Sequence, residues 1–306
     1  MVGTPLADGG YDRSLHVQAL LDLTADTAIT IDSRRARPIT VTVPEPDADS
    51  VLAEVSFSQD GLRAPYAEVG PTFDGLSTEF LGEPRPADEF TAHIVSQWAR
   101  PSADGTFADS PYLYALAEAF AGRLPTGFSK HYRKSELATV HQRFAAVPPG
   151  EYAQRSVFPD LTGSAGAAWP IPTSAPGSRV EYYTTGSTWS TFLEFGPRDE
   201  SGFLQSRGIF ADSTREYRAG SHNRDSWAAH RTARRYLPSR AAGCPGPAKT
   251  STPSSPCTGT GTVTPARSAS TRPTRRSSAT ASWWARPTSP AAASSPRRRG
   301  RRPTGS

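Results

Sequence analysis

Histidines are the side chains in this sequence best suited to bind a metal ion or to transfer protons near neutral pH. The chain of 306 residues has six of them: His16, His93, His131, His141, His222 and His230. None of them has the His-x-x-x-His or His-Glu-x-x-His spacing that places two imidazoles on one metal ion. His93 and His141 fall in stretches that alternate apolar and polar residues, where a half-exposed strand side chain is the simpler interpretation. The sequence therefore predicts no metal site.

Other catalytic patterns are missing from the sequence as well. His222 and Asp225 are close enough in sequence to meet in a turn, but one such pair indicates little by itself. The sequence contains no glycine-rich phosphate loop with its lysine, no Gly-x-Ser-x-Gly elbow and no motif of paired carboxylates. We therefore predict no catalytic residue, no cofactor-binding residue and no cofactor.

Aromatic residues offer a different chemistry, because a flat ring can stack on a sugar. Four tryptophans precede the last 64 residues: Trp98, Trp169, Trp189 and Trp227. Large aromatic side chains also dominate the cores of β proteins that lack disulfides, and core packing is the simpler explanation for most of these four. A sugar-binding face stays open as the alternative.

Charge divides the chain into two unlike parts. Of the 34 Lys and Arg residues, 11 lie from Lys249 onward, whereas all 29 acidic residues lie before Gly243. The first 242 residues therefore carry 23 basic and 29 acidic residues, a net charge of minus six. A basic segment can bind nucleic acid, but this one has only Trp283 and Trp284 for base stacking. The sequence argues against a nucleic-acid partner.

The two cysteines, Cys244 and Cys257, also lie in the basic part. The first 242 residues can therefore form neither a disulfide nor a thiolate metal site. The residues after Met1 lack the basic start and apolar run of a signal peptide, and no stretch has the length of a membrane span. We predict no membrane partner, and a cytoplasmic location if the chain is made as it stands.

Period-two alternation of apolar and polar residues predicts several half-buried strands. The predicted ranges are 27–31, 38–43, 51–57, 92–98, 137–144, 179–183 and 188–195. The stretch from Tyr112 to Phe120 fits either a helix or a strand, and the β context favours a strand. The residues 184–187 between two predicted strands suit a hairpin turn. These patterns predict a mainly β fold, a sandwich-like body of short antiparallel strands.

The last part of the chain, residues 241–306, is predicted to be disordered. From Gly243 onward it has no Ile, Leu, Met, Phe, Tyr, Asp or Glu, so it cannot bury enough apolar surface to fold. The genetic code suggests a cause. When each codon is rebuilt from the last base of one triplet and the first two of the next, Trp283-Trp284-Ala285 becomes Val-Gly. When the codons of neighbouring stretches are read in the same shifted frame, they can encode the acidic and aliphatic residues that the tail lacks. This indicates that the tail is a frameshifted translation.

Four short strings resemble the region downstream of the catalytic domain in secreted actinomycete subtilisin-like serine proteases. They are residues 23–32 (LTADTAITID), 73–78 (FDGLST), 124–129 (LPTGFS) and 216–220 (EYRAG), and the resemblance covers about residues 5 to 240. It implies that residues 1–43 are the incomplete end of a small β-sandwich and that residues 44–240 are a β-rich accessory domain. It also implies an extracellular location for the parent protein.

The sequence lacks the segments that contain the catalytic residues of that family. The family needs an Asp, a His in a His-Gly-Thr-His type segment and a Ser in a Gly-Thr-Ser-Met-Ala segment, and none of these segments occurs here. We therefore predict a non-catalytic accessory region, present as a truncated fragment, whose partner is the catalytic domain of a parent protease. The alternative is an independent β-sandwich binding module for a polysaccharide or a protein. An unrecognised enzyme is a third reading.

Overall fold

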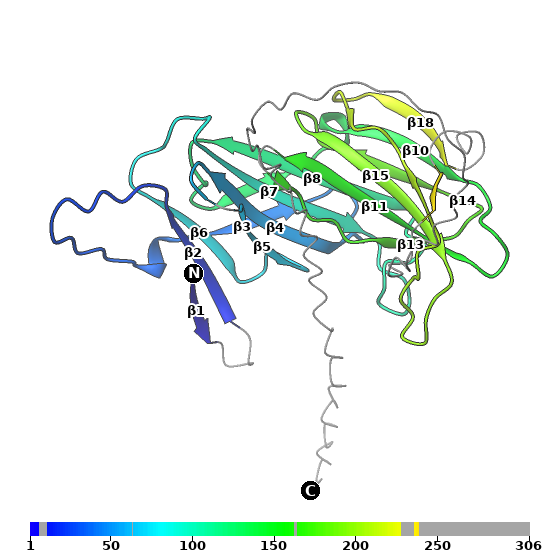
Figure 1. Ribbon diagram of the computed structural model, residues 1–306, viewed down its shortest axis with the longest axis horizontal. Helices are drawn as coiled ribbons and strands as arrows, with labels where there is room; N and C mark the ends of the chain where they lie inside the picture. Colours follow the sequence, from blue (N-terminus) through cyan, green and yellow to red (C-terminus); the bar gives the residue numbers. More distant parts are fainter. Residues whose placement is uncertain (6–10, 63, 162–163, 228–235, 239–306) are drawn as a thin grey trace, which may run out of the picture. The chain divides into compact units, whose positions relative to one another are not determined.

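The computed structural model describes residues 1–5, 11–62, 64–161, 164–227 and 236–238. Nearly all regular structure in these ranges is β-strand, arranged in three sheets, so the prediction of a mainly β fold is confirmed (Figure 1). The predicted tail at residues 241–306 and His230 lie outside the described residues.

The first sheet has five strands in the order β1-β2-β6-β3-β9. These strands are β1 (Val2–Pro5), β2 (Tyr11–Gln18), β6 (Leu76–Leu81), β3 (Arg37–Thr42) and β9 (Phe128–His131). A short 3-10 helix, η1 (Ser33–Arg35), precedes β3. β2 runs parallel to β6, and β3 runs parallel to β9. The sheet thus joins strands from both sides of the boundary predicted at residue 43.

The second sheet has seven strands in the order β18-β10-β14-β8-β7-β4-β5. They are β18 (His222–Trp227), β10 (Ala138–Phe144), β14 (Gly177–Tyr183), β8 (Tyr112–Ala121), β7 (Phe90–Ala99), β4 (Asp49–Gln59) and β5 (Tyr66–Gly70). The helix η2 (Lys134–Glu136) leads into β10. The pairs β10–β18 and β14–β8 are parallel, whereas the other pairs of this sheet are antiparallel.

The third sheet is built around two long antiparallel strands, β11 (Tyr152–Leu161) and β15 (Thr188–Gly196). Short strands extend it on both sides: β12 (Ser164–Ala165), β13 (Ile171–Thr173), β16 (Gly208–Ala211), β17 (Arg215–Glu216) and β19 (Tyr236–Pro238). β13 pairs with β11, and β17 pairs with β15.

Apolar clusters cover both faces of the second sheet. One contains Leu15 and Val41 of the first sheet with Ile94 of β7, and another contains Val140 of β10 with Trp189 of β15. The second sheet is therefore covered on both faces, which explains why β4, β7 and β8 each contain runs of six buried residues. Polar side chains on these strands must find partners inside the protein.

Seven of the strands predicted from alternation are present, including the ambiguous stretch from Tyr112 to Phe120, which forms β8. One predicted strand is wrong. Residues 27–31 form no strand, and Ile29 and Ile31 are about half exposed, at 47% and 53%. Alternation indicates a strand only where a neighbouring strand can complete its hydrogen bonds, and no described strand pairs with this segment.

The predicted hairpin at residues 184–187 is also wrong. The strands on either side, β14 and β15, belong to different sheets. Thr184 explains the difference, since its hydroxyl accepts from the Ala117 backbone N–H at 2.9 Å and its carbonyl accepts from the Trp189 indole at 3.2 Å. The segment therefore turns from one layer into the next rather than folding back in the same sheet.

Candidate binding site

The structure does not bring the histidines together, and the described residues contain no group of His, Cys, Asp and Glu that could hold a metal ion. His131, His141 and His222 are exposed. His93 differs from its prediction: it is 1% exposed rather than half exposed, because β7 is covered on both faces, and this burial lowers the pKa of its imidazole. His16 is also enclosed, and its contacts are described below.

The pair His222 and Asp225 does not meet in a turn. Both residues lie on strand β18, where His222 is exposed and Asp225 is buried. Residues three apart on a strand point to opposite faces. Asp225 instead lies 3.5 Å from the Arg215 guanidinium.

The tryptophans are divided between core and surface. Trp189 and Trp227 are buried, and Trp98 packs against the first apolar cluster. Trp169 is the exception, because 51% of its surface is exposed. Core packing therefore accounts for three of the four rings.

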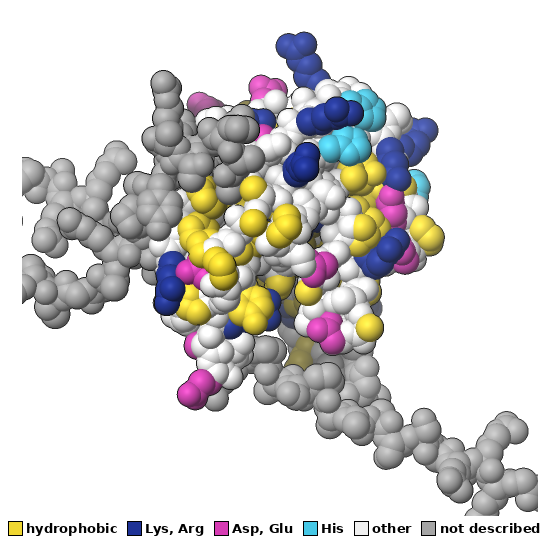
Figure 2. All heavy atoms as spheres, turned by 90° about the vertical axis from the view of Figure 1, so that its right-hand side faces the viewer, with side chains coloured by type: hydrophobic (Ala, Val, Ile, Leu, Met, Phe, Trp, Pro, Cys, Tyr) yellow, Lys and Arg dark blue, Asp and Glu magenta, His cyan; other side chains and the backbone are white. Residues whose placement is uncertain are grey.

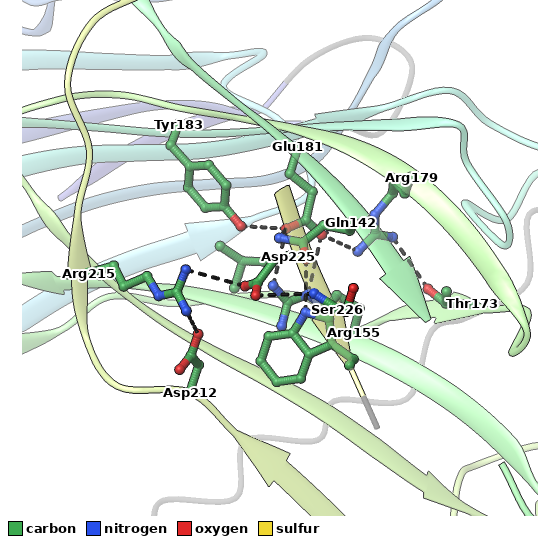
Figure 3. Close-up of polar contacts among 12 residues, drawn as sticks. Gln142, Arg155, Thr173, Arg179, Glu181, Tyr183, Asp212, Arg215, Asp225 and Ser226 are labelled. Carbon is green, nitrogen blue, oxygen red and sulfur yellow. Dashed lines mark hydrogen bonds and ion pairs between the residues drawn. The ribbon is translucent and has the colours of Figure 1, made fainter. Parts of the chain in front are cut away.

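The densest group of charged side chains lies between the second and third sheets, around Glu181 of β14 (Figure 3). Arg179, from the same strand, donates to Glu181 at 2.7 Å, and Arg155, from β11, donates at 3.2 Å. Gln142 of β10 donates at 2.9 Å, and the Tyr183 hydroxyl also donates to this carboxylate. Both carboxylate oxygens therefore have charged or polar donors.

Alternation explains how these residues meet. Arg179, Glu181 and Tyr183 are alternate residues of β14, so their side chains leave the same face of the strand. That face is turned toward β11, where Arg155 occupies a position of the same kind between the buried residues Ala153 and Val157. The sequence-based predictions do not include this cluster, although charged residues stand at apolar positions of two alternating stretches, which is a visible signal.

The cluster is sealed from solvent. The side chains of Arg155 and Glu181 are 0% exposed, and the Arg155 guanidinium lies 4.1 Å from the ring centre of Trp227. Burial alone would raise the pKa of Glu181, but Arg155 and Arg179 outweigh it and hold the pKa at about 2. Burial and the neighbouring Glu181 raise the pKa of Tyr183 well above its usual value. The Glu181 carboxylate is thus saturated and links the two sheets, whereas Arg155 Nη1 is buried without a hydrogen-bond partner among the described residues.

A cavity of about 500 Å³ lies beside the beginning of β11. Its walls come from several segments: residues 108–109, 147, 151–153, 172–176 and 198. Figure 2 looks onto the side of the described fold where β13, β14 and β18 are drawn in Figure 1. Apolar side chains gather on this side, with acidic and basic side chains around them.

Glu151 lines the cavity and carries an acceptor oxygen that the described residues do not use. Its side chain is 8% exposed, and Oε1 accepts from Arg207 Nη1 at 3.1 Å. The other oxygen, Oε2, is buried and has no hydrogen-bond partner among the described residues. A buried carboxylate oxygen without a donor costs free energy, which a ligand donor could recover.

An aromatic ring follows directly in the sequence. Tyr152 is 51% exposed, and the Arg198 guanidinium lies 4.6 Å from the centre of its ring. The opposite wall is fixed by Asp109, whose carboxylate accepts from both the backbone N–H and the hydroxyl of Ser174. Asp109 has a positive φ of 55°, a conformation that Asp adopts more readily than most residues. The cavity wall thus contains a glutamate with one buried, unpartnered oxygen, an exposed ring and a fixed aspartate.

Comparisons with protein-family models, with curated proteins and with solved structures found no match to this chain. Among the described residues, no helix has the length and apolar character needed to cross a membrane.

Proposed function

We propose that the described β fold is an accessory region of a secreted subtilisin-like protease, that it does not carry the peptide-bond cleavage of that family, and that it acts by binding a polysaccharide. The protease context rests on the four strings named in the sequence analysis. The binding role rests on one structural observation, the unpartnered buried oxygen of Glu151, a residue that lines a cavity together with Tyr152.

The chemistry of the cavity favours a neutral ligand with many hydroxyl groups. Glu151 is already paired with Arg207, so its remaining oxygen needs a hydrogen-bond donor more than it needs a second cation. A sugar hydroxyl is such a donor, and the apolar face of a sugar ring can stack on an exposed tyrosine. Of the two ligand classes that the sequence left open, a polysaccharide therefore fits better than a protein.

The binding role can be tested with the full chain on a panel of insoluble polysaccharides, followed by calorimetry with soluble oligosaccharides of the type retained. We expect Glu151→Ala and Tyr152→Ala each to weaken binding by about 10-fold or more, since a hydrogen bond to a charged group is worth about 1.5–3 kcal/mol. A matched control is Glu194→Ala, because Glu194 lies on the same sheet and its carboxylate already accepts from Gln154 at 2.6 Å.

Three results would count against this role. They are no retention on any polysaccharide, binding that is unchanged in both cavity variants, and binding that depends on Trp169, which lies outside the cavity walls. If the chain bound a protein and no glycan, the polysaccharide proposal would be wrong and a protein would be the ligand.

The protease context has a separate test, which is to read the genomic DNA upstream of the codon for Met1. An in-frame sequence that ends in a subtilisin-like domain supports it, and a promoter with a ribosome-binding site directly before Met1 contradicts it. Resequencing of the region that encodes residues 241–306 tests the frameshift. Early stop codons in the shifted frame would rule it out.

A further inference from the structure

A second polar group lies on the first sheet, on the face turned away from the core. On β2, Leu15 and Val17 belong to the apolar cluster, so the alternate residues Ser14 and His16 point to the opposite face. The parallel pairing of β2 with β6 places Glu79 directly opposite His16. Local alternation and strand register thus bring a serine, a histidine and a glutamate together.

The three side chains form a chain of hydrogen bonds with a defined order of atoms. His16 Nδ1 lies 2.8 Å from Glu79 Oε2, and His16 Nε2 lies 3.0 Å from the Ser14 hydroxyl. The second oxygen of Glu79 forms an ion pair with Arg35, whose Nε lies 3.0 Å away. The side chains of His16 and Glu79 are only 2% and 3% exposed, so the imidazole is held in place by its partners.

This order matches what a serine nucleophile requires. The carboxylate orients the imidazole through Nδ1, and Nε2 then accepts the proton of the hydroxyl. The residues share no sequence motif with the three catalytic segments of subtilisin-like proteases, and their site lies on a different sheet from the Glu151 cavity.

Ser14 lies at the wall of a cavity of about 420 Å³, although the residue itself is only 7% exposed. Its hydroxyl also donates to the Val2 carbonyl at 3.5 Å, a longer contact than the 3.0 Å to His16 Nε2. The cavity wall combines serine and arginine side chains with the carboxylate of Asp12. The hydroxyl and guanidinium donors in this wall suit a ligand that carries carbonyl oxygens.

We propose that Ser14 is a nucleophile toward small polar carboxylic esters, with His16 as its general base and Glu79 as the residue that positions His16. Ser14 Oγ bonds to the ester carbonyl carbon while its proton passes to His16 Nε2. The bond to the alcohol oxygen then breaks, and the departing alcohol takes that proton. Water, deprotonated by His16, next attacks the acyl-serine, and a carboxylic acid and free Ser14 are released.

The test is labelling of the full chain with a fluorophosphonate probe, in which a serine oxygen displaces fluoride from phosphorus. We expect one adduct, located on Ser14 by mass spectrometry, and none in Ser14→Ala. His16→Ala should lower the maximal labelling rate by about 100-fold or more, and added imidazole should restore part of it. Glu79→Gln should lower the maximal rate without changing the probe concentration at half-saturation, and Glu79→Asp should recover part of the loss.

The controls separate chemistry from folding. Ser102→Ala removes a half-buried loop serine outside the cavity walls and should label like the parent chain. Near-ultraviolet circular dichroism of every variant reports whether the tryptophan environments are intact. The proposal is overturned if the folded chain gives no adduct on Ser14, if the adduct forms on another serine, or if His16→Ala labels at the parent rate. None of these outcomes depends on polysaccharide binding at Glu151.

Discussion

Glu181 and Glu151 are both buried glutamates paired with arginine, yet their surroundings differ in one respect. Glu181 has donors on both oxygens: two arginines, Gln142 and Tyr183. Glu151 has Arg207 on one oxygen, and its other oxygen lacks a partner among the described residues. The first glutamate joins two sheets, whereas the second lines a cavity. Saturation rather than burial is therefore the feature that distinguishes the structural role of Glu181 from the binding role proposed for Glu151.

The largest effect should follow removal of the saturated carboxylate. Glu181→Ala leaves Arg155 and Arg179 as uncompensated buried cations, and loss of one partner of a buried pair costs about 3–5 kcal/mol. Urea unfolding followed by tryptophan fluorescence measures this, because Trp227 stacks on Arg155. The matched control is Glu194→Ala on the neighbouring sheet. A loss of less than about 1 kcal/mol for Glu181→Ala would show that the cluster does not hold the sheets together.

Acid should weaken the same cluster. The pKa of Glu181 is lowered from its usual 4.5 to about 2, so its contribution to stability is complete above pH 4.5 and is lost as the pH falls toward 2. A shift of that size corresponds to a loss on the order of 3 kcal/mol. Unfolding curves at several pH values within this window measure the loss. Glu181→Gln should flatten the dependence, and an equal slope in the variant would assign the loss to other groups.

Much of the strand content could be predicted from the sequence, because burial on one face leaves a period of two in stretches such as 188–195. The partners of the strands could not be predicted in this way. The segment 27–31 has the pattern of a strand but no described neighbour, and the hairpin predicted at 184–187 is a crossing between sheets. Local alternation determines which side chains of a strand share a face. It does not determine which other strand pairs with that strand.

The buried Glu181 cluster and the proposed Ser14 site were missed for the same reason. Arg155 and Glu181 lie on strands of different sheets, and Ser14 and His16 meet Glu79 only because β2 pairs in parallel with a strand that begins 58 residues after its own last residue. Such contacts depend on sheet order, which the sequence pattern alone leaves open. A charged residue at a buried position of an alternating stretch, such as Arg155, shows that it needs a partner of opposite charge. The pattern does not show where in the sequence that partner lies.

Glu54 is a third buried glutamate, and unlike Glu181 and Glu151 it has no arginine partner among its described contacts. Burial raises the pKa of Glu54, although the backbone N–H of Ala167 donates to it at 2.6 Å and opposes the shift. A raised pKa means that stability is highest when this carboxyl is protonated and decreases as the pH rises through its folded pKa. Glu54→Gln should therefore stabilise the protein near pH 7 by up to about 1 kcal/mol. A destabilised variant would indicate a partner that Gln cannot replace.

The smallest change in stability is expected at Glu151. Its ion pair with Arg207 involves an arginine whose side chain is 66% exposed, and such pairs contribute about 0–1 kcal/mol. Glu151→Ala also removes Oε2, a buried acceptor without a donor, which by itself should stabilise the protein. This gain opposes the loss of the ion pair. Glu151→Ala should change the free energy of unfolding by less than about 1 kcal/mol, measured in the same urea experiment as Glu181→Ala. The same variant should weaken polysaccharide binding by about 10-fold or more. If Glu151→Ala instead destabilised the protein as strongly as Glu181→Ala, the two glutamates would share a structural role, and the unpartnered oxygen would no longer indicate a ligand.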